Sequence, residues 1–297
     1  MNTFRKAAAL LPLSLCGEAL VLPEDIKASA EEMRLRCGQA MTVLSGGKEI
    51  TIAPDRIITS DDLYSVMEKA TCASMHAVEN ELSHGYLSVE NGIRIGICGT
   101  GIMRKGELSG IRDFSSLAIR IPHDVSGCSR EAFNKINCDS IKNVLVVSPP
   151  GYGKTTFLRD YIRCLSECGL RVAVADERGE LAAVCDGTPQ FDLGRSTDIM
   201  NGIKKADAAG MMLKTMNPQV IVMDEISGES DISAVASAAG CGVKIIATAH
   251  AGGISDLRCR KQYRELLSMS IFEYAVIIHN DKSGRTYTCE ELASCDI

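Results

Sequence analysis

The sequence predicts an α/β protein with two domains: a smaller α+β domain, then a domain built on a mainly parallel sheet. The length of 297 residues is about twice that of a typical domain. Short apolar, β-branched runs alternate with helical patterns in the second half, as parallel βαβ units require. The first half shows short glycine-rich strands without this alternation. We expect domains at 1–125 and 143–297, joined by a polar linker over 126–142.

Composition excludes some classes of partner. The chain carries 32 Lys and Arg against 38 Asp and Glu, a net charge of −6, so it has no general polyanion-binding surface. It lacks Trp, and aromatic residues make up 4%, so base-stacking platforms are scarce. We therefore expect no DNA partner. The 13 cysteines show no CxxC pair or repeated spacing; this favours reduced thiols and a cytoplasmic protein.

The first domain combines helical and strand patterns. We expect a helix over 25–36, a hairpin at Gly46-Gly47 and a helix over 60–82. Short strands follow between 85 and 121, where glycines are frequent. This mixture predicts an α+β domain.

The N-terminus resembles a signal peptide only superficially. Arg5 and Lys6 precede an apolar stretch, but Pro12 interrupts it and no clean small-residue cleavage site follows. We expect an amphipathic helix that packs on its own domain. No apolar run reaches the ~18 residues that a membrane span needs.

The second domain alternates strand and helix from residue 144 onward. Its last strand pairs with a following segment around Ser283-Gly284, which indicates an antiparallel hairpin over 274–279 and 285–289. The expected strands are 144–148, 171–176, 220–224, 243–248 and 274–278, and the expected helices are 154–168, 203–216, 231–239 and 261–270.

A phosphate-binding loop lies between the first of these strands and its helix. Glycines at 151 and 153 allow backbone N–H groups to surround phosphate oxygens, and the helix N-terminus adds positive potential. Lys154 would reach the β and γ phosphates, Thr155 would ligate Mg²⁺, and Thr156 would contact the α phosphate. Ser148 replaces the usual first glycine, which needs only an ordinary backbone angle there. The candidate nucleotide-binding residues are Pro150, Gly151, Tyr152, Gly153, Lys154, Thr155 and Thr156.

A second acidic element follows about seventy residues later. The apolar run Val220 to Met223 ends in Asp224 and Glu225, which a strand would carry to the nucleotide at the carboxyl edge of the sheet. Asp224 would hold Mg²⁺ through water, and Glu225 would polarise the attacking water. Together with the phosphate loop, this pair predicts binding of ATP or another nucleoside triphosphate.

Two further strand ends point to the same edge. One runs into Asp176 to Glu180, where Glu177 would help to order metal-bound water. The other ends at Thr248 to His250, where His250 would sense the γ phosphate. A surface ion pair is the plainer alternative for Arg178 and Glu180.

These motifs, in this order, resemble the hexameric ATPases of type II and type IV secretion and pilus machines. The sequence is more similar still to the stage III sporulation protein AA family. The resemblance rests on the phosphate loop, Asp176 to Glu180, Asn217 to Glu225, Asp231, Ala238 to Val243, Thr248 to His250, and, in the first half, Glu32 to Arg36, Gly92 to Gly96 and Ile111 to Pro122.

The resemblance implies a RecA-like P-loop ATPase core in a ring of identical subunits, six by analogy. It also implies a cytoplasmic ATPase of the mother cell that powers a membrane-embedded sporulation channel, with the channel's membrane proteins as partners. An arginine from a neighbouring subunit commonly stabilises the transferring phosphoryl group. Arg94 and Arg112 are the first candidates; Arg120, Arg195 and Arg258 rank behind them.

Two other functions remain open from the sequence. A small-molecule kinase also needs a phosphate loop, but it normally has an arginine-rich lid and an acceptor pocket, which the sequence does not reveal. A nucleotide-gated scaffold or RNA-binding protein with slow hydrolysis would use the local basic surface around Arg94, Arg104, Lys105 and Arg112.

Overall fold

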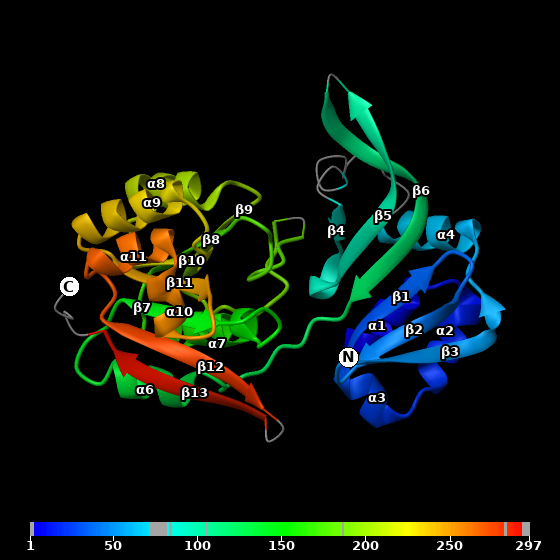
Figure 1. Cartoon of the computed structure of the whole chain (residues 1–297), viewed down its shortest axis with the longest axis horizontal. Helices are drawn as coiled ribbons and strands as arrows, with labels where there is room; N and C mark the ends of the chain where they lie inside the picture. The colour runs from blue at the N-terminus through cyan, green and yellow to red at the C-terminus, as the bar shows by residue number, and fades with distance from the viewer. Residues whose placement is uncertain are drawn as a thin grey trace. The chain divides into compact units, whose positions relative to one another are not determined.

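The computed structural model describes residues 3–71, 82, 85–104, 106–185, 187–281 and 284–292. The chain divides into two compact units: unit 1 is Met1–His123 with Ala183–Gln190, and unit 2 is Asp124–Ala182 with Phe191–Ile297. Figure 1 labels the elements of both.

Unit 1 is built on an antiparallel sheet. Its strand order is β3-β2-β1-β6-β5-β4, and every neighbouring pair is antiparallel. Gly46 and Gly47 turn the β2–β3 hairpin with φ of 56° and 75°, which confirms the predicted hairpin. The strands are β1 (Ala30–Arg36), β2 (Ala40–Ser45), β3 (Lys48–Ile57), β4 (Tyr86–Ser88), β5 (Arg94–Arg104) and β6 (Glu107–Arg120).

The helices of unit 1 bury their apolar side chains against this sheet. At the N-terminus, Pro12 separates α1 (Thr3–Ala9) from α2 (Leu13–Val21), and Phe4 and Leu15 are buried in the core of the unit. Helix α4 (Ser60–Ala70) begins with a capping box in which Thr59 and Asp62 exchange hydrogen bonds. The rest of the helix expected over 60–82 falls largely outside the described residues.

The prediction of a helix over 25–36 is wrong. Helix α3 ends at Ser29 (Glu24–Ser29), and Ala30–Arg36 forms the central strand β1. Met33 and Leu35 are buried, whereas the intervening Arg34 is partly exposed, which is strand periodicity. Pairing with β2 and β6 on both sides outweighs the local helical tendency.

Unit 2 is a mainly parallel sheet with the strand order β13-β12-β7-β11-β10-β8-β9. All neighbouring pairs are parallel except β12–β13, the predicted hairpin. The strands are β7 (Val144–Ser148), β8 (Val172–Asp176), β9 (Thr197–Asn201), β10 (Val220–Glu225), β11 (Lys244–His250), β12 (Tyr274–Asp281) and β13 (Gly284–Glu291).

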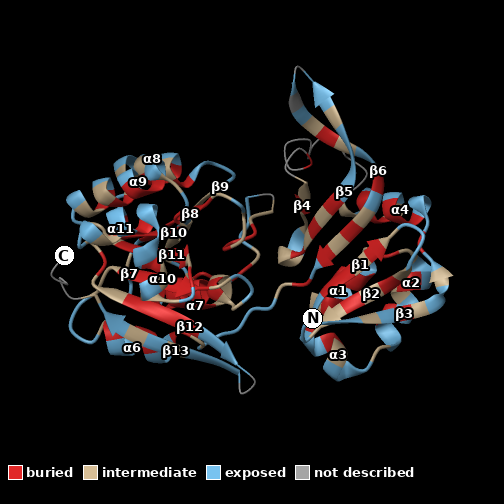
Figure 2. Cartoon of the chain, viewed as in Figure 1, coloured by how far each residue is buried: buried red, intermediate tan, exposed pale blue. Residues whose placement is uncertain are grey.

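Helices cover both faces of this sheet (Figure 1). Helices α8 and α9 pack on one face, where Leu145 and Val147 of β7 point, and α6 and α7 lie on the other. The central strands are therefore buried on both sides (Figure 2), as expected from their continuous apolar runs. The helices are α6 (Arg130–Ile136), α7 (Lys154–Glu167), α8 (Lys205–Thr215), α9 (Glu229–Gly240), α10 (Ile254–Cys259) and α11 (Lys261–Ser268).

The segment expected as a linker, 126–142, differs from that expectation. It belongs to unit 2 and contains α6, which packs against α7. The buried carboxylate of Asp160 on α7 accepts hydrogen bonds from the backbone N–H groups of Gly127 (2.8 Å) and Ser129 (2.7 Å). These bonds fix the segment to the domain, although its polar composition is typical of a free connection. None of the helices in the described ranges is long and apolar enough to cross a membrane.

Candidate functional site

The loop from β7 to α7 has the geometry that phosphate binding requires. Gly151 and Gly153 have φ of 80° and 89°, a region that residues with a Cβ rarely adopt. Helix α7 starts at Lys154 and has no side-chain cap, so the N–H groups of its first turn remain available to an anion. Ser148 ends β7 in extended backbone, which is the ordinary backbone angle expected there, and its side chain is fully buried.

The strand order places the predicted strand ends next to one another. β11 lies between β7 and β10, and β8 follows β10. In this register His250 pairs with Ser148, and Thr248 pairs with Glu225. The four polar strand ends that the sequence assigned to one edge are therefore neighbours.

Three predicted site residues form a continuous chain of contacts at this edge. Nζ of Lys154 lies 2.8 Å from Nδ1 of His250, and Nε2 of His250 lies 3.2 Å from Oε2 of Glu225. Nζ of Lys154 also lies 3.2 Å from Nε2, and Nδ1 lies 3.3 Å from the backbone oxygen of Ser148, so Lys154, Ser148 and Glu225 all contact this one ring. His250 thus connects the phosphate loop to the acid predicted to activate water.

Lys154 is 9% exposed although it carries the charge of the site. Burial lowers its pKa to about 8, while the carboxylates of Glu225, Glu180 and Asp224 oppose this shift. Phosphate oxygens would supply the counter-charge that the buried ammonium lacks.

Asp224, the predicted Mg²⁺ ligand, is buried beside this chain. Its Oδ1 atom is buried without a hydrogen-bond partner, and Nζ of Lys205 lies 3.5 Å away. Burial raises the pKa of Asp224 to about 7, and Lys205 works in the opposite direction. A buried, unsatisfied carboxylate oxygen near the phosphate loop fits a hydrated Mg²⁺. Across the described ranges, no group of three His, Cys, Asp or Glu side chains could hold a metal alone, so phosphate and water would complete the coordination.

Lys205, in the first turn of α8, was not predicted from the sequence. It lies among three carboxylates: Glu177 at 3.2 Å, Asp224 at 3.5 Å and Asp231 at 3.7 Å. Burial alone would lower its pKa, but these carboxylates raise it. Glu177, expected to order metal-bound water, is thus held in an ion pair. In the sequence nothing distinguishes Lys205 from its exposed neighbour Lys204.

Two other acidic residues of the predicted motifs, Asp176 and Asp231, accept hydrogen bonds from nearby backbone N–H groups. Asp176 is fully buried and accepts hydrogen bonds from the backbone N–H groups of Glu180, Leu181 and Ala182, so it shapes the loop after β8. Burial raises its pKa, although these donors work in the opposite direction. Asp231 accepts from the backbone of Ser227 and caps α9.

The predicted arginines Arg94 and Arg112 lie in unit 1, on β5 and β6. The guanidinium of Arg94 lies 3.9 Å from the ring centre of Tyr86. Arg112 forms an exposed ion pair with Asp113 at 2.9 Å. Both contacts are local to the unit 1 sheet.

The family model "Sporulation stage III, protein AA" matches residues 13–289 of this chain. The chain belongs to this sporulation family. Stage III sporulation protein AA of Bacillus subtilis (strain 168) is 31% identical over 272 residues, which cover 90% of this chain and 88% of that protein. The predicted family resemblance is confirmed.

The fold of this chain also resembles the folds of solved secretion and pilus ATPases. The pilus retraction motor PilT with bound ADP superposes with a TM-score of 0.60 at 16% identity, over 90% of this chain and 80% of that one. The ATPase DotB of Legionella pneumophila gives a TM-score of 0.58 at 14% identity, over 88% and 76%. The chain therefore has the α/β fold of these ATPases, with an antiparallel-sheet domain before the mainly parallel one, as predicted.

Proposed function

We propose that this member of the stage III sporulation protein AA family is a Mg²⁺-dependent ATPase. The observation that carries the proposal is the chain of contacts from Lys154 through His250 to Glu225, at the mouth of the phosphate loop. The fold similarity to PilT, whose structure contains ADP, supports a nucleotide at this loop. A kinase would also need an acceptor site, for which the described residues give no separate support.

In this proposal each residue has a distinct task. The glycine-rich loop and the first turn of α7 bind the β phosphate through backbone N–H groups. Lys154 turns from His250 to the β and γ phosphates and stabilises the charge that develops between them. Glu225 orients the attacking water and accepts its proton, while His250 holds the Glu225 carboxylate and contacts the γ phosphate.

Thr155 and Asp224 would hold Mg²⁺ in this site. The ion supplies charge neutralisation for the phosphate oxygens. Lys205 keeps Asp224 and Glu177 in place beside it by neutralising part of their charge.

We further propose that the protein acts as a hexameric ring on the cytoplasmic side of the mother-cell membrane. There it would energise a sporulation channel through contacts with the channel's membrane proteins. This part rests on family membership and on the fold shared with secretion ATPases. Arg94 or Arg112 would complete the site of a neighbouring subunit. Arg112 lies where β5 and β6 continue as a two-stranded extension, whereas Arg94 lies in the body of the sheet and pairs with both β4 and β6.

Phosphate release and nucleotide binding by two variants test the ATPase. We expect Lys154→Ala to abolish both, and Glu225→Gln to abolish release while ATP still binds. The exposed Lys261→Ala of α11 is the matched control and should resemble the wild type. Turnover in either site variant would refute the assignment. A wild type that binds ATP and RNA in a salt-dependent way without releasing phosphate would favour the RNA-binding alternative.

A further inference from the structure

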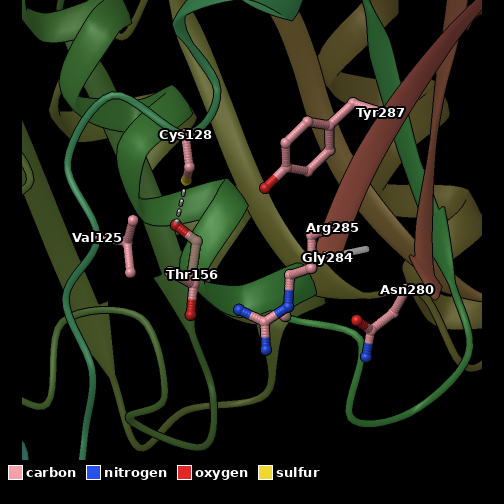
Figure 3. Close-up of a pocket in the computed structure, with 8 residues that line it drawn as sticks. Val125, Cys128, Thr156, Asn280, Gly284, Arg285 and Tyr287 are labelled. Carbon is pink, nitrogen blue, oxygen red and sulfur yellow. Dashed lines mark hydrogen bonds between the residues drawn. The ribbon is translucent and has the colours of Figure 1, made fainter. Parts of the chain in front are cut away.

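A cavity of about 430 Å³ opens beside the phosphate loop within unit 2 (Figure 3). One wall comes from the start of the unit and the other from the terminal β12–β13 hairpin, with the first turn of α7 between them. The residues that carry the argument are Val125, Cys128, Thr156, Asn280, Arg285 and Tyr287.

A nucleotide with its β and γ phosphates at the loop would extend its sugar and base toward this cavity. Loop N–H groups and Lys154 take the β and γ phosphates, and Thr156 lies where the α phosphate is expected. The sugar and base must then continue past Thr156. The cavity that Thr156 lines is the space on that side of the loop (Figure 3).

The walls suit a planar, partly polar group. The ring of Tyr287 packs on Phe157 with centroids 4.9 Å apart, which holds it firmly, and its hydroxyl points into the cavity (Figure 3). Val125 offers an apolar surface from the opposite side, and Asn280 supplies an amide with both a donor and an acceptor. A volume of this size lies within the range of small-molecule sites.

Arg285 links the cavity to the loop. Its guanidinium packs so closely on Gly153 that a Cβ there would lie 2.9 Å from Cζ and from Nε. Among the described residues, no carboxylate lies within salt-bridge distance of Arg285. A guanidinium held against a phosphate loop without an acidic partner is well placed to bind phosphate.

We propose that this cavity binds the nucleoside half of the nucleotide, and that Arg285 of the same subunit contacts the phosphate nearest to the sugar. The inference rests on the proposed ATPase function and deepens it. It assigns a nucleotide-binding role to the terminal hairpin, which carries no phosphate-binding motif.

Binding of ATP and of inorganic tripolyphosphate, both with Mg²⁺, separates the two halves of the site. Val125 is 42% exposed, so Val125→Trp can fill the cavity without disturbing the core. We expect this variant to bind ATP at least about tenfold more weakly and tripolyphosphate as the wild type does, because only the nucleoside is excluded. Unchanged tripolyphosphate binding also shows that the variant is folded.

Arg285→Gln should weaken the binding of ATP and of tripolyphosphate by about tenfold each, because it removes a charged contact with phosphate. The exposed Arg264→Gln of α11 makes the same chemical change away from the cavity and should alter neither affinity. Wild-type ATP affinity in Val125→Trp would overturn the nucleoside site, and wild-type affinity for both ligands in Arg285→Gln would overturn the role of the arginine.

The failure of this inference can be distinguished from the failure of the ATPase proposal. If Lys154→Ala abolishes binding of both ligands while Val125→Trp has no effect, only the nucleoside site is refuted. If the wild type binds neither ligand, or Lys154→Ala changes neither affinity, the phosphate loop itself is misassigned and both proposals fail.

Discussion

The imidazole of His250 holds the side chain of Lys154: their Nδ1 and Nζ atoms lie 2.8 Å apart. An imidazole ring, and not a carboxylate, is therefore the direct partner of Lys154. The Glu225 carboxylate lies 3.2 Å from Nε2 of the same ring, and Nζ of Lys154 lies 3.2 Å from that nitrogen as well. A phosphate that enters the loop would bring a negatively charged partner directly to the ammonium.

Binding of ATP should weaken above pH 8. The pKa of Lys154 is lowered to about 8, so below that pH the ammonium is already charged and no proton is needed. Above it the free protein loses the proton, and phosphate binding must restore it. Affinity should then fall by up to about tenfold per pH unit. Calorimetric titrations in buffers of different ionisation enthalpy would measure the proton uptake.

The variant Lys154→Arg provides the control for this pH dependence. Arginine keeps its charge throughout the range, so any residual ATP binding should not change between pH 7 and 9.5. A wild-type affinity that stays constant over the same range would contradict the prediction.

Asp224→Asn should stabilise the nucleotide-free protein at pH 8 while it abolishes Mg²⁺-dependent hydrolysis. The folded pKa of Asp224 is about 7, above its ordinary value of 3.8. Between those values the folded protein binds a proton that the unfolded chain lacks, so stability falls as pH rises through this window. Asparagine removes the cost of the buried charge, and we expect a gain of the order of 1–2 kcal/mol.

Urea unfolding at pH 8 and pH 4 measures this effect. The gain should be largest at pH 8 and should shrink toward pH 4, where the wild-type carboxyl is already protonated in the folded state. Equal differences between variant and wild type at the two pH values would show that Asp224 is not a costly buried charge.

Lys205→Met should destabilise the protein by about 3 kcal/mol, because it leaves the carboxylates of Glu177, Asp224 and Asp231 without their shared cation. The adjacent Lys204→Met removes an exposed ammonium and should change the free energy of unfolding by less than about 0.5 kcal/mol. Adding Asp224→Asn to Lys205→Met should recover part of the loss. Strict additivity in denaturant unfolding would mean that the two side chains do not interact.

Asp160→Asn should destabilise the protein by about 2 kcal/mol at neutral pH, since Asp160 joins residues 127–129 to α7. Burial alone would raise the pKa of Asp160, but hydrogen bonds from Ser129 and Arg163 keep it below the ordinary value. The stability from this carboxylate is present above the unfolded pKa, near 4, and is lost as pH falls through the folded pKa.

Unfolding at pH 7 and pH 3 would check this prediction. The difference between Asp160→Asn and the wild type should decrease in acid. The exposed Asp139→Asn serves as the control and should have no measurable effect at either pH.

The parallel sheet and its polar edge were predictable because they depend on local patterns. Continuous, β-branched apolar runs such as Val144 to Val147 are typical of strands buried on both faces. A strand followed by Gly-Lys-Thr and a helix favours a phosphate loop. Adjacent strand ends then follow from parallel connectivity. This is why Lys154, His250 and Glu225 could be grouped without a structure.

Other features depend on partners that are distant along the chain. Ala30–Arg36 has a helical tendency but pairs with strands on both sides, and the polar 126–142 segment is fixed by a carboxylate on α7. Their local sequence does not reveal these contacts.

The sequence by itself determined the family and most of the alternating strands and helices of the second domain, although it did not predict α6, β9 or α10. The residues proposed for the phosphate loop also came from the sequence, because such features reside in short motifs and their spacing. Only the tertiary structure decided that Lys205 is the buried cation among three acids and that Arg285 lies against Gly153. The physical reason is that burial and electrostatic environment are properties of the packed molecule: one lysine or arginine in a sequence looks like another until folding removes water from around it.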